Sequence, residues 1–108
     1  MGMKLLCFYV PAEHCESVKE AVFQAGGGQL GLYRACAWQT EGQGQFIPQP
    51  NSQPHIGEPE KKSYVSEFKV EITCSDACIA ACVRAMITAH PYETPAYHVV
   101  SVSNPSAS

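Results

Sequence analysis

With 108 residues, 45% of them hydrophobic and 16% charged, the chain has the size and composition of one globular domain. The formal net charge is −3, and the seven Lys and Arg residues are scattered rather than gathered in a basic stripe. This excludes a typical nucleic-acid-binding protein, and no nucleic-acid partner is expected.

The start of the chain predicts neither a signal peptide nor a membrane span. Its apolar run, Leu5 to Val10, is too short for either. Six cysteines without an export signal indicate reduced thiols, so we expect a cytoplasmic protein with no membrane partner. We interpret residues 1–3 as a tag remnant or flexible start, residues 4–102 as a single domain and residues 103–108 as a flexible tail.

The first half of the chain predicts a strand, a helix and a second strand. Residues 4–10 form a short apolar run that ends at a proline, as in a buried strand. Residues 13–25 place apolar side chains on one face of a helix, and the glycines at 26–28 are expected to end it. This glycine run lacks the Lys-Ser/Thr of a phosphate-binding loop. Residues 30–40 are predicted to form the second strand.

A long connection follows at residues 41–59, rich in glycine, proline and glutamine. Such a connection inside a compact domain is usually functional, interfacial or disordered. Because it contains Phe46, Ile47 and Ile56, we expect an irregular β-hairpin arm that packs on something rather than a free linker.

The second half repeats the pattern of strand, helix and strand. Residues 64–74 alternate between an apolar face and a charged face, as in a strand with one buried and one open side. Ser75 is expected to cap a second helix, and Pro91 to end it near Ala89. Residues 96–102 are predicted to form the last strand.

Two such units predict an α+β, ferredoxin-like βαββαβ sandwich. Right-handed crossovers place two helices on one face of a four-stranded antiparallel sheet, with the long β-hairpin-like arm between the halves. The charged face of residues 67–71 then remains uncovered by helices and is a natural oligomer interface.

The turn from His90 to Tyr97 holds two prolines, two tyrosines, a histidine and a glutamate within eight residues. Imidazole and carboxylate both bind zinc-like ions, so His90, Glu93 and a partner such as His98 are candidate ligands for a divalent metal ion. The simpler interpretation, which the residues favour, is that His90 ends the helix beside its free carbonyl groups.

Three cysteines, Cys74, Cys78 and Cys82, are spaced by four residues. A pair at this spacing shares a helix face and can bind a metal, but a zinc site needs four ligands and the chain contains no Cys-x-x-Cys pair. Packing as small buried side chains is the favoured interpretation. Cys7 or Cys36 could act as a nucleophile only beside a histidine, and we predict no catalytic residue.

Four motifs together resemble a known family. They are His-Pro-Tyr-Glu-Thr-Pro-Ala-Tyr at 90–97, Cys-Ala-Trp-Gln-Thr at 36–40, Gly-Gln-Gly-Gln-Phe at 42–46 and Ile-Gly-Glu at 56–58. They look like the PII-like, CutA-like domain inserted in bacterial dinuclear-metal-centre hexameric proteins, and like the short stand-alone relatives of that domain. The likeness spans residues 4–102.

This resemblance implies a PII- or CutA-like fold that tends to form trimers, with the arm reaching a neighbouring subunit. In the larger proteins a separate domain binds the two metals, and its ligand motifs are absent here, so di-metal chemistry is not carried over. The chain also departs from the family pattern. Thr94 replaces the second glutamate of the turn, and His98 replaces an aspartate.

We therefore expect a non-enzymatic, homo-oligomeric binding or regulatory module, a homotrimer with clefts between subunits. A small molecule or a metal is the expected ligand, and the alternative function is divalent-metal binding of the CutA kind through His90, Glu93 and His98. The candidate ligand-binding residues are Trp38, Phe46, His90, Tyr92, Glu93 and Tyr97.

Overall fold

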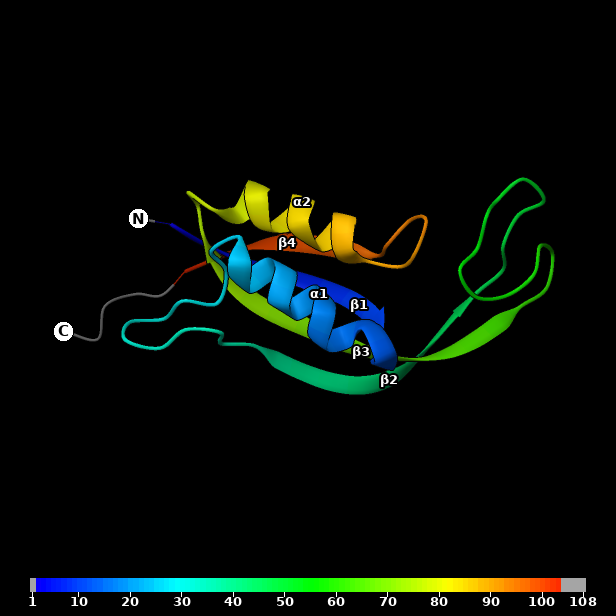
Figure 1. The fold of residues 1–108 in the computed structure, drawn as a ribbon, viewed down its shortest axis with the longest axis horizontal. Helices are drawn as coiled ribbons and strands as arrows, with labels where there is room; N and C mark the ends of the chain where they lie inside the picture. Colours follow the sequence, from blue (N-terminus) through cyan, green and yellow to red (C-terminus); the bar gives the residue numbers. More distant parts are fainter. Residues whose placement is uncertain (1, 104–108) are drawn as a thin grey trace.

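The computed structural model describes residues 2–103, so Met1 and most of the expected tail lie outside the described residues. Four strands and two helices follow one another along the chain (Figure 1). In order they are β1 (Met3–Pro11), α1 (Ala12–Gln24), β2 (Trp38–Phe46), β3 (Ser63–Ser75), α2 (Ile79–Ala89) and β4 (Tyr97–Val102).

The strands form one antiparallel sheet in the order β2-β3-β1-β4. Both helices lie on the same face of this sheet (Figure 1). The two central strands, β1 and β3, come from different halves of the chain, which locks the two β-α-β units together. The predicted ferredoxin-like fold is confirmed.

The core lies between the sheet and the two helices. Alternate residues of β1, Leu6, Phe8 and Val10, are fully buried, as are Val70 and Ile72 of the neighbouring strand β3. The helices complete the core with Cys15, Val18, Val22, Cys82 and Met86. Burial of every second strand residue confirms the predicted two-faced pattern of β3. Within the described residues, neither helix offers the long apolar stretch that crossing a membrane requires.

The second strand lies further along the chain than predicted. Residues 30–36 are irregular, with Leu30 and Tyr33 bridging each other across a tight turn. Gly31 and Ala35 have φ angles of 58° and 56°, which a regular strand cannot accommodate. The strand begins instead at Trp38.

The second helix ends where predicted and begins later than predicted. It runs to Ala89, and His90 takes an extended conformation with φ −72° and ψ 139°. Ser75 does not cap it, because Ser75 is still the last residue of β3 and Cys78 is the residue that precedes the helix. Asp76 in the intervening turn pairs with Lys4 at 2.8 Å.

The arm is a β-hairpin whose stem is formed by β2 and the first half of β3, paired up to Phe46 opposite Ser63. Its tip, residues 47–62, is closed by its own hydrogen bonds, including the Glu60 N–H to the Pro48 carbonyl at 2.6 Å. The arm projects from the helix-covered body and stretches the molecule to 54 × 22 × 22 Å (Figure 1). The expectation of an irregular hairpin arm is confirmed.

Candidate functional site

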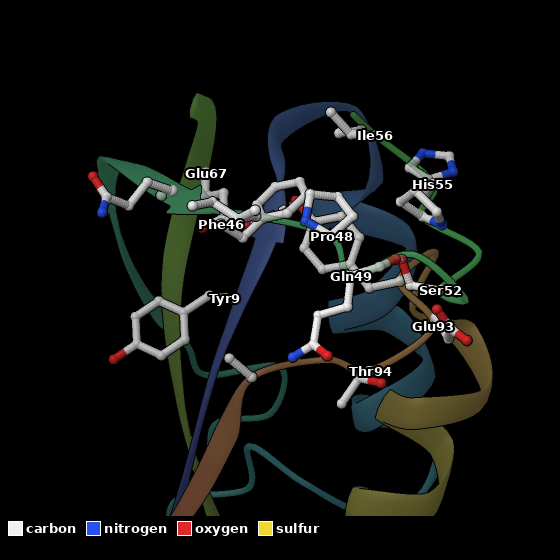
Figure 2. A pocket seen from close by; sticks show the side chains of 16 residues that line it. Tyr9, Phe46, Pro48, Gln49, Ser52, His55, Ile56, Glu67, Glu93 and Thr94 are labelled. Carbon is white, nitrogen blue, oxygen red and sulfur yellow. Dashed lines mark hydrogen bonds between the residues drawn. The ribbon is translucent and has the colours of Figure 1, made fainter. Parts of the chain in front are cut away.

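A pocket of about 600 Å³ lies where the arm meets the end of the body (Figure 2). Its walls come from strands β1, β2 and β3, from the arm tip, and from the turn that follows α2. The lining residues are Tyr9, Gly44 to Gln49, Ser52, Pro54 to Ile56, Glu67, Tyr92 to Thr94, and Ala96.

His90 anchors the turn to the sheet behind this pocket. The Tyr92 backbone N–H donates to His90 Nδ1 at 3.1 Å, so Nδ1 is the unprotonated nitrogen. The proton of the neutral ring is then on Nε2, which donates to the Tyr9 carbonyl at 2.7 Å. Only 7% of the residue is exposed. Both nitrogens are used by backbone groups, and the ring acts as a structural clamp between β1 and the turn.

Burial lowers the pKa of His90, while the hydrogen bond to Tyr9 and the charge of Glu67 oppose this shift only in part. We therefore expect the free energy of unfolding to fall as the pH drops from 7.5 to 5.5. In this window the unfolded chain, with a histidine pKa near 6.5, binds a proton that the folded chain does not bind. The loss begins near pH 6.5 and grows until the pH reaches the folded-state pKa. Guanidinium unfolding at several pH values measures it.

Two glutamine variants sharpen this test. His90→Gln is expected to flatten the pH dependence, because the titrating group is gone. His98→Gln changes an exposed histidine and is expected to keep the wild-type slope. Equal slopes in all three proteins would show that His90 is not the group responsible.

Tyr92 and Glu67 form the polar wall of the pocket. The Tyr92 hydroxyl donates to Glu67 Oε2 at 2.8 Å. Burial, followed by the interaction with Glu67, raises the pKa of Tyr92, so the phenol remains a donor. The opposite side of Glu67 faces Gly44, where even a Cβ atom would overlap the carboxylate. The glycine of the arm thus gives Glu67 the space it occupies.

Glu93 ties the turn to the arm tip. Its Oε1 accepts the Gln53 backbone N–H at 2.8 Å. His55 of the tip lies edge-on to His14 of α1, with ring centroids 5.4 Å apart, and 6.3 Å from the Tyr92 ring. These contacts close the tip over the pocket.

The pocket lining carries one sign of charge. Glu67 and Glu93 are its two carboxylates, and the lining residues include no Lys or Arg. Aromatic rings from Tyr9, Phe46 and Tyr92, together with the His55 ring, make up much of the remaining wall. Such a lining favours ligands that donate hydrogen bonds or carry positive charge.

The six candidate ligand-binding residues divide into two groups. Phe46, Tyr92 and Glu93 line the pocket, and His90 supports it from behind with its ring 4.8 Å from that of Tyr92. Trp38 lies at the opposite end of β2 from Phe46, about 27 Å away at the usual rise per strand residue.

Tyr97 lies outside the pocket, as the first residue of β4. It pairs with Phe8 of β1 and is 42% exposed.

The three candidate metal ligands do not gather around one point. His90 uses both ring nitrogens within the fold. His98 faces Cys7 on the sheet and approaches the Tyr9 ring at 6.3 Å. Among the described residues, the cluster of three or more ligating side chains is formed instead by Cys74, Cys78 and Cys82.

Four of the six cysteines have raised pKa values. All six are free thiols. Burial raises the pKa of Cys7, Cys15, Cys74 and Cys82, so these four remain protonated at neutral pH. Reactive thiols have lowered pKa values, whereas the pKa values of these four thiols are raised.

Sequence reasoning missed Tyr9, Glu67 and His55 as pocket residues. Strand alternation predicts Glu67 on the open face of the sheet, and its hydrogen bond with Tyr92 depends on the tertiary structure. No local sequence motif indicates that any of these three residues lines a pocket.

The chain is similar in sequence to part of larger proteins. A GTP cyclohydrolase 1 type 2 homolog of Mycobacterium leprae is 40% identical over 97 residues, which are 90% of this chain and 25% of that protein. One of Bacillus subtilis is 38% identical over 105 residues, 97% of this chain and 28% of that protein. The chain thus spans about a quarter of the length of these relatives. No family model matches it.

Solved structures match the chain in fold. A Bacillus cereus protein related to NIF3 matches with a TM-score of 0.81 and 35% identity, over 95% of this chain and 26% of that one. CutA from Archaeoglobus fulgidus matches in fold with a TM-score of 0.68 and 14% identity, over 97% of this chain and 88% of that one. GlnK of Bacillus subtilis matches in fold with a TM-score of 0.64 and 11% identity, over 95% of this chain and 87% of that one. The predicted resemblance to a PII-like, CutA-like domain is confirmed.

Proposed function

We propose that this PII-like, CutA-like chain is a non-enzymatic binding module that holds a small organic cation in the pocket beneath its arm. The observation that carries the proposal is the lining of that pocket, with two carboxylates, four aromatic rings and no Lys or Arg. A pocket of about 600 Å³ has the size of a small-molecule site.

The chemistry of the lining sets the ligand class. An ammonium group over an aromatic face gains about 0.5–2 kcal/mol, and more when it is desolvated beside a carboxylate. Glu67 is half-buried and already oriented by the Tyr92 hydroxyl, so its carboxylate, which packs against Gly44 on the side of Oε1, is the proposed acceptor for the ligand's N–H groups. Phosphates would meet two negative charges here. GTP chemistry, which the names of the relatives mention, is therefore not part of the proposal.

We also infer that the module is homo-oligomeric, with a trimer as the expected state. The side of the sheet away from the helices carries Trp38, which is 59% exposed. Its neighbour Gln39 points the other way, toward Lys19 of α1 at 2.7 Å, so strand alternation leaves Trp38 on the helix-free face. On the edge strand β4, exposed Val100 lies on this same face, whereas exposed Tyr97 and Val99 pair with the core residues Phe8 and Leu6 and lie on the other face. A second copy of the chain would cover these side chains and the unpaired edge.

Six free thiols in a chain of this size fit a reducing compartment, and the cytoplasm is the proposed location.

Native mass spectrometry with three matched probes tests the binding proposal and the oligomeric state together. Tyramine, tyrosol and 4-hydroxyphenylacetate share one aromatic skeleton and differ in being cationic, neutral and anionic. We expect a trimer that retains tyramine at least about tenfold more tightly than tyrosol, as one charge-assisted hydrogen bond provides, and that does not retain the acid. Equal retention of the three probes would contradict the cation site, and a monomer at micromolar concentration would contradict self-association.

A further inference from the structure

The cysteines Cys74, Cys78 and Cys82 meet at the opposite end of α2 from the pocket. Cys74 lies near the end of β3, Cys78 directly precedes α2, and Cys82 is one turn into the helix. Their three sulfur atoms all lie within 4.8 Å of one another, and those of Cys78 and Cys82 are 3.8 Å apart. The turn between β3 and α2 therefore gathers ligands from two elements.

This spacing is close to that of a three-coordinate metal site. Sulfurs bound at about 2.3 Å around an ion in their own plane lie about 4 Å from one another. The Cys78 and Cys82 sulfurs already meet this distance, and Cys74 needs a shift of less than about 1 Å. A χ1 rotation of about 30° moves a cysteine sulfur by about this distance.

The glycine turn after α1 covers the three sulfurs. A Cβ atom at Gly27 would lie 3.2 Å from the sulfurs of both Cys74 and Cys82, and one at Gly26 would lie 3.3 Å from the Cys78 Cβ. Cys74 and Cys82 are buried, whereas Cys78 is half-exposed and offers a path for entry. The Ser75 hydroxyl donates toward the Cys78 sulfur at 3.3 Å.

We propose that Cys74, Cys78 and Cys82 bind one soft, monovalent metal ion, Cu(I). Three thiols with no imidazole or carboxylate in the group select a soft ion over calcium, magnesium or manganese. Zinc favours four ligands, whereas the cluster supplies three. The nearby carboxylate of Asp76 is held by Lys4 at 2.8 Å.

Charge at the cluster is offset only in part by the ion itself. Each coordinated thiol loses its proton to solvent, so three thiolates and one Cu(I) together carry a net charge of −2. The N-terminus of α2, which starts between Cys78 and Cys82, adds the positive end of the helix dipole. The ion enters and remains as Cu(I), so no electron is transferred.

The test uses fully reduced protein under anaerobic conditions, with Cu(I) supplied as its acetonitrile complex and bicinchoninate as a competing chelator. We expect one Cu(I) per chain in the unaltered protein and in Cys36→Ser, which alters a thiol outside the cluster. Cys78→Ser is expected to weaken binding by about 100-fold or more, because even changes in the second shell of a metal site cost about 10- to 100-fold. Equal binding by Cys78→Ser, failure of the unaltered protein to hold Cu(I), or tighter retention of Zn(II) would each overturn the proposal.

A second measurement needs no variant and decides the matter if Cys78→Ser does not fold. The unaltered protein is alkylated with iodoacetamide with and without Cu(I), and the modified peptides are counted by mass spectrometry. Protection of Cys78 by Cu(I), with Cys36 still modified, supports the site. Equal modification of Cys78 in both conditions overturns it.

Discussion

Replacing Phe8 by alanine is expected to lower the free energy of unfolding by about 3–5 kcal/mol. Phe8 is fully buried in β1, the strand that pairs with both β3 and β4. Its removal leaves a cavity between the sheet and both helices that the paired backbone cannot close. Because small domains have about 5–15 kcal/mol in total, this single change brings the protein near its unfolding threshold. Urea unfolding followed by circular dichroism measures the effect.

Leu32→Ala is the matched control, since its side chain is fully exposed in the irregular segment after α1. We expect a change within about 0.5 kcal/mol at low protein concentration. A loss that grows with protein concentration would place Leu32 in a contact between copies. A cost below about 1 kcal/mol for Phe8→Ala would contradict the described core.

Replacing both pocket carboxylates, Glu67→Gln with Glu93→Gln, is expected to weaken tyramine binding by roughly 50-fold, the product of the two single losses. A charge-assisted hydrogen bond in a desolvated site contributes about 1.5 kcal/mol or more. The two single variants should differ in how much tyramine affinity they lose. Glu67 is half-buried, so its loss should cost about tenfold or more, whereas exposed Glu93 should cost no more than about fivefold because water screens its charge. Isothermal titration calorimetry measures all three.

Glu58→Gln is the control for that experiment. Glu58 also lies in the arm tip, pairs with Lys61 at 3.0 Å, and is outside the pocket lining. It should leave tyramine affinity unchanged. If Glu58→Gln weakens binding as much as Glu67→Gln does, the effect is one of overall charge and the assigned site is wrong.

Much of the fold could be predicted from the sequence, because neighbouring residues determine where several helices and strands form and end. Pro91 restricts His90 to an extended conformation, and the second helix ends there. In β3, the alternation of apolar and charged side chains predicts a strand with one buried face. These signals depend on neighbours in the chain and need no knowledge of tertiary contacts.

The second strand could not be placed from local chemistry. Apolar residues at 30–36 favoured a strand there, but their side chains point into solvent around a tight turn. The true strand, Trp38–Phe46, is rich in Gln and Gly and has no buried face to produce alternation. Its conformation is imposed by pairing with β3, and tertiary pairing of this kind overrides intrinsic preference.

Only part of the candidate site could be predicted from the sequence, because the rest also depends on tertiary pairing. Phe46, Tyr92 and Glu93 stand in dense motifs, and all three line the pocket. Glu67 and Tyr9 line the pocket because of the register between the strands, and this register cannot be derived from the local sequence. Similarly, the spacing of Cys78 and Cys82 predicts a shared helix face, but the approach of Cys74 depends on the shape of the turn before the helix.

The arm tip has a thermodynamic consequence for the proposed assembly. It rests on the body through contacts such as the Gln53 N–H on Glu93, an exposed carboxylate, so lifting the tip costs less than disturbing the core. A ligand beneath the tip must hold it closed, and its affinity is reduced by that cost. In the proposed oligomer, a neighbouring copy that held the same tip would remove this cost in advance. By reciprocity, the factor by which a neighbour tightens ligand binding is the factor by which the ligand tightens the assembly.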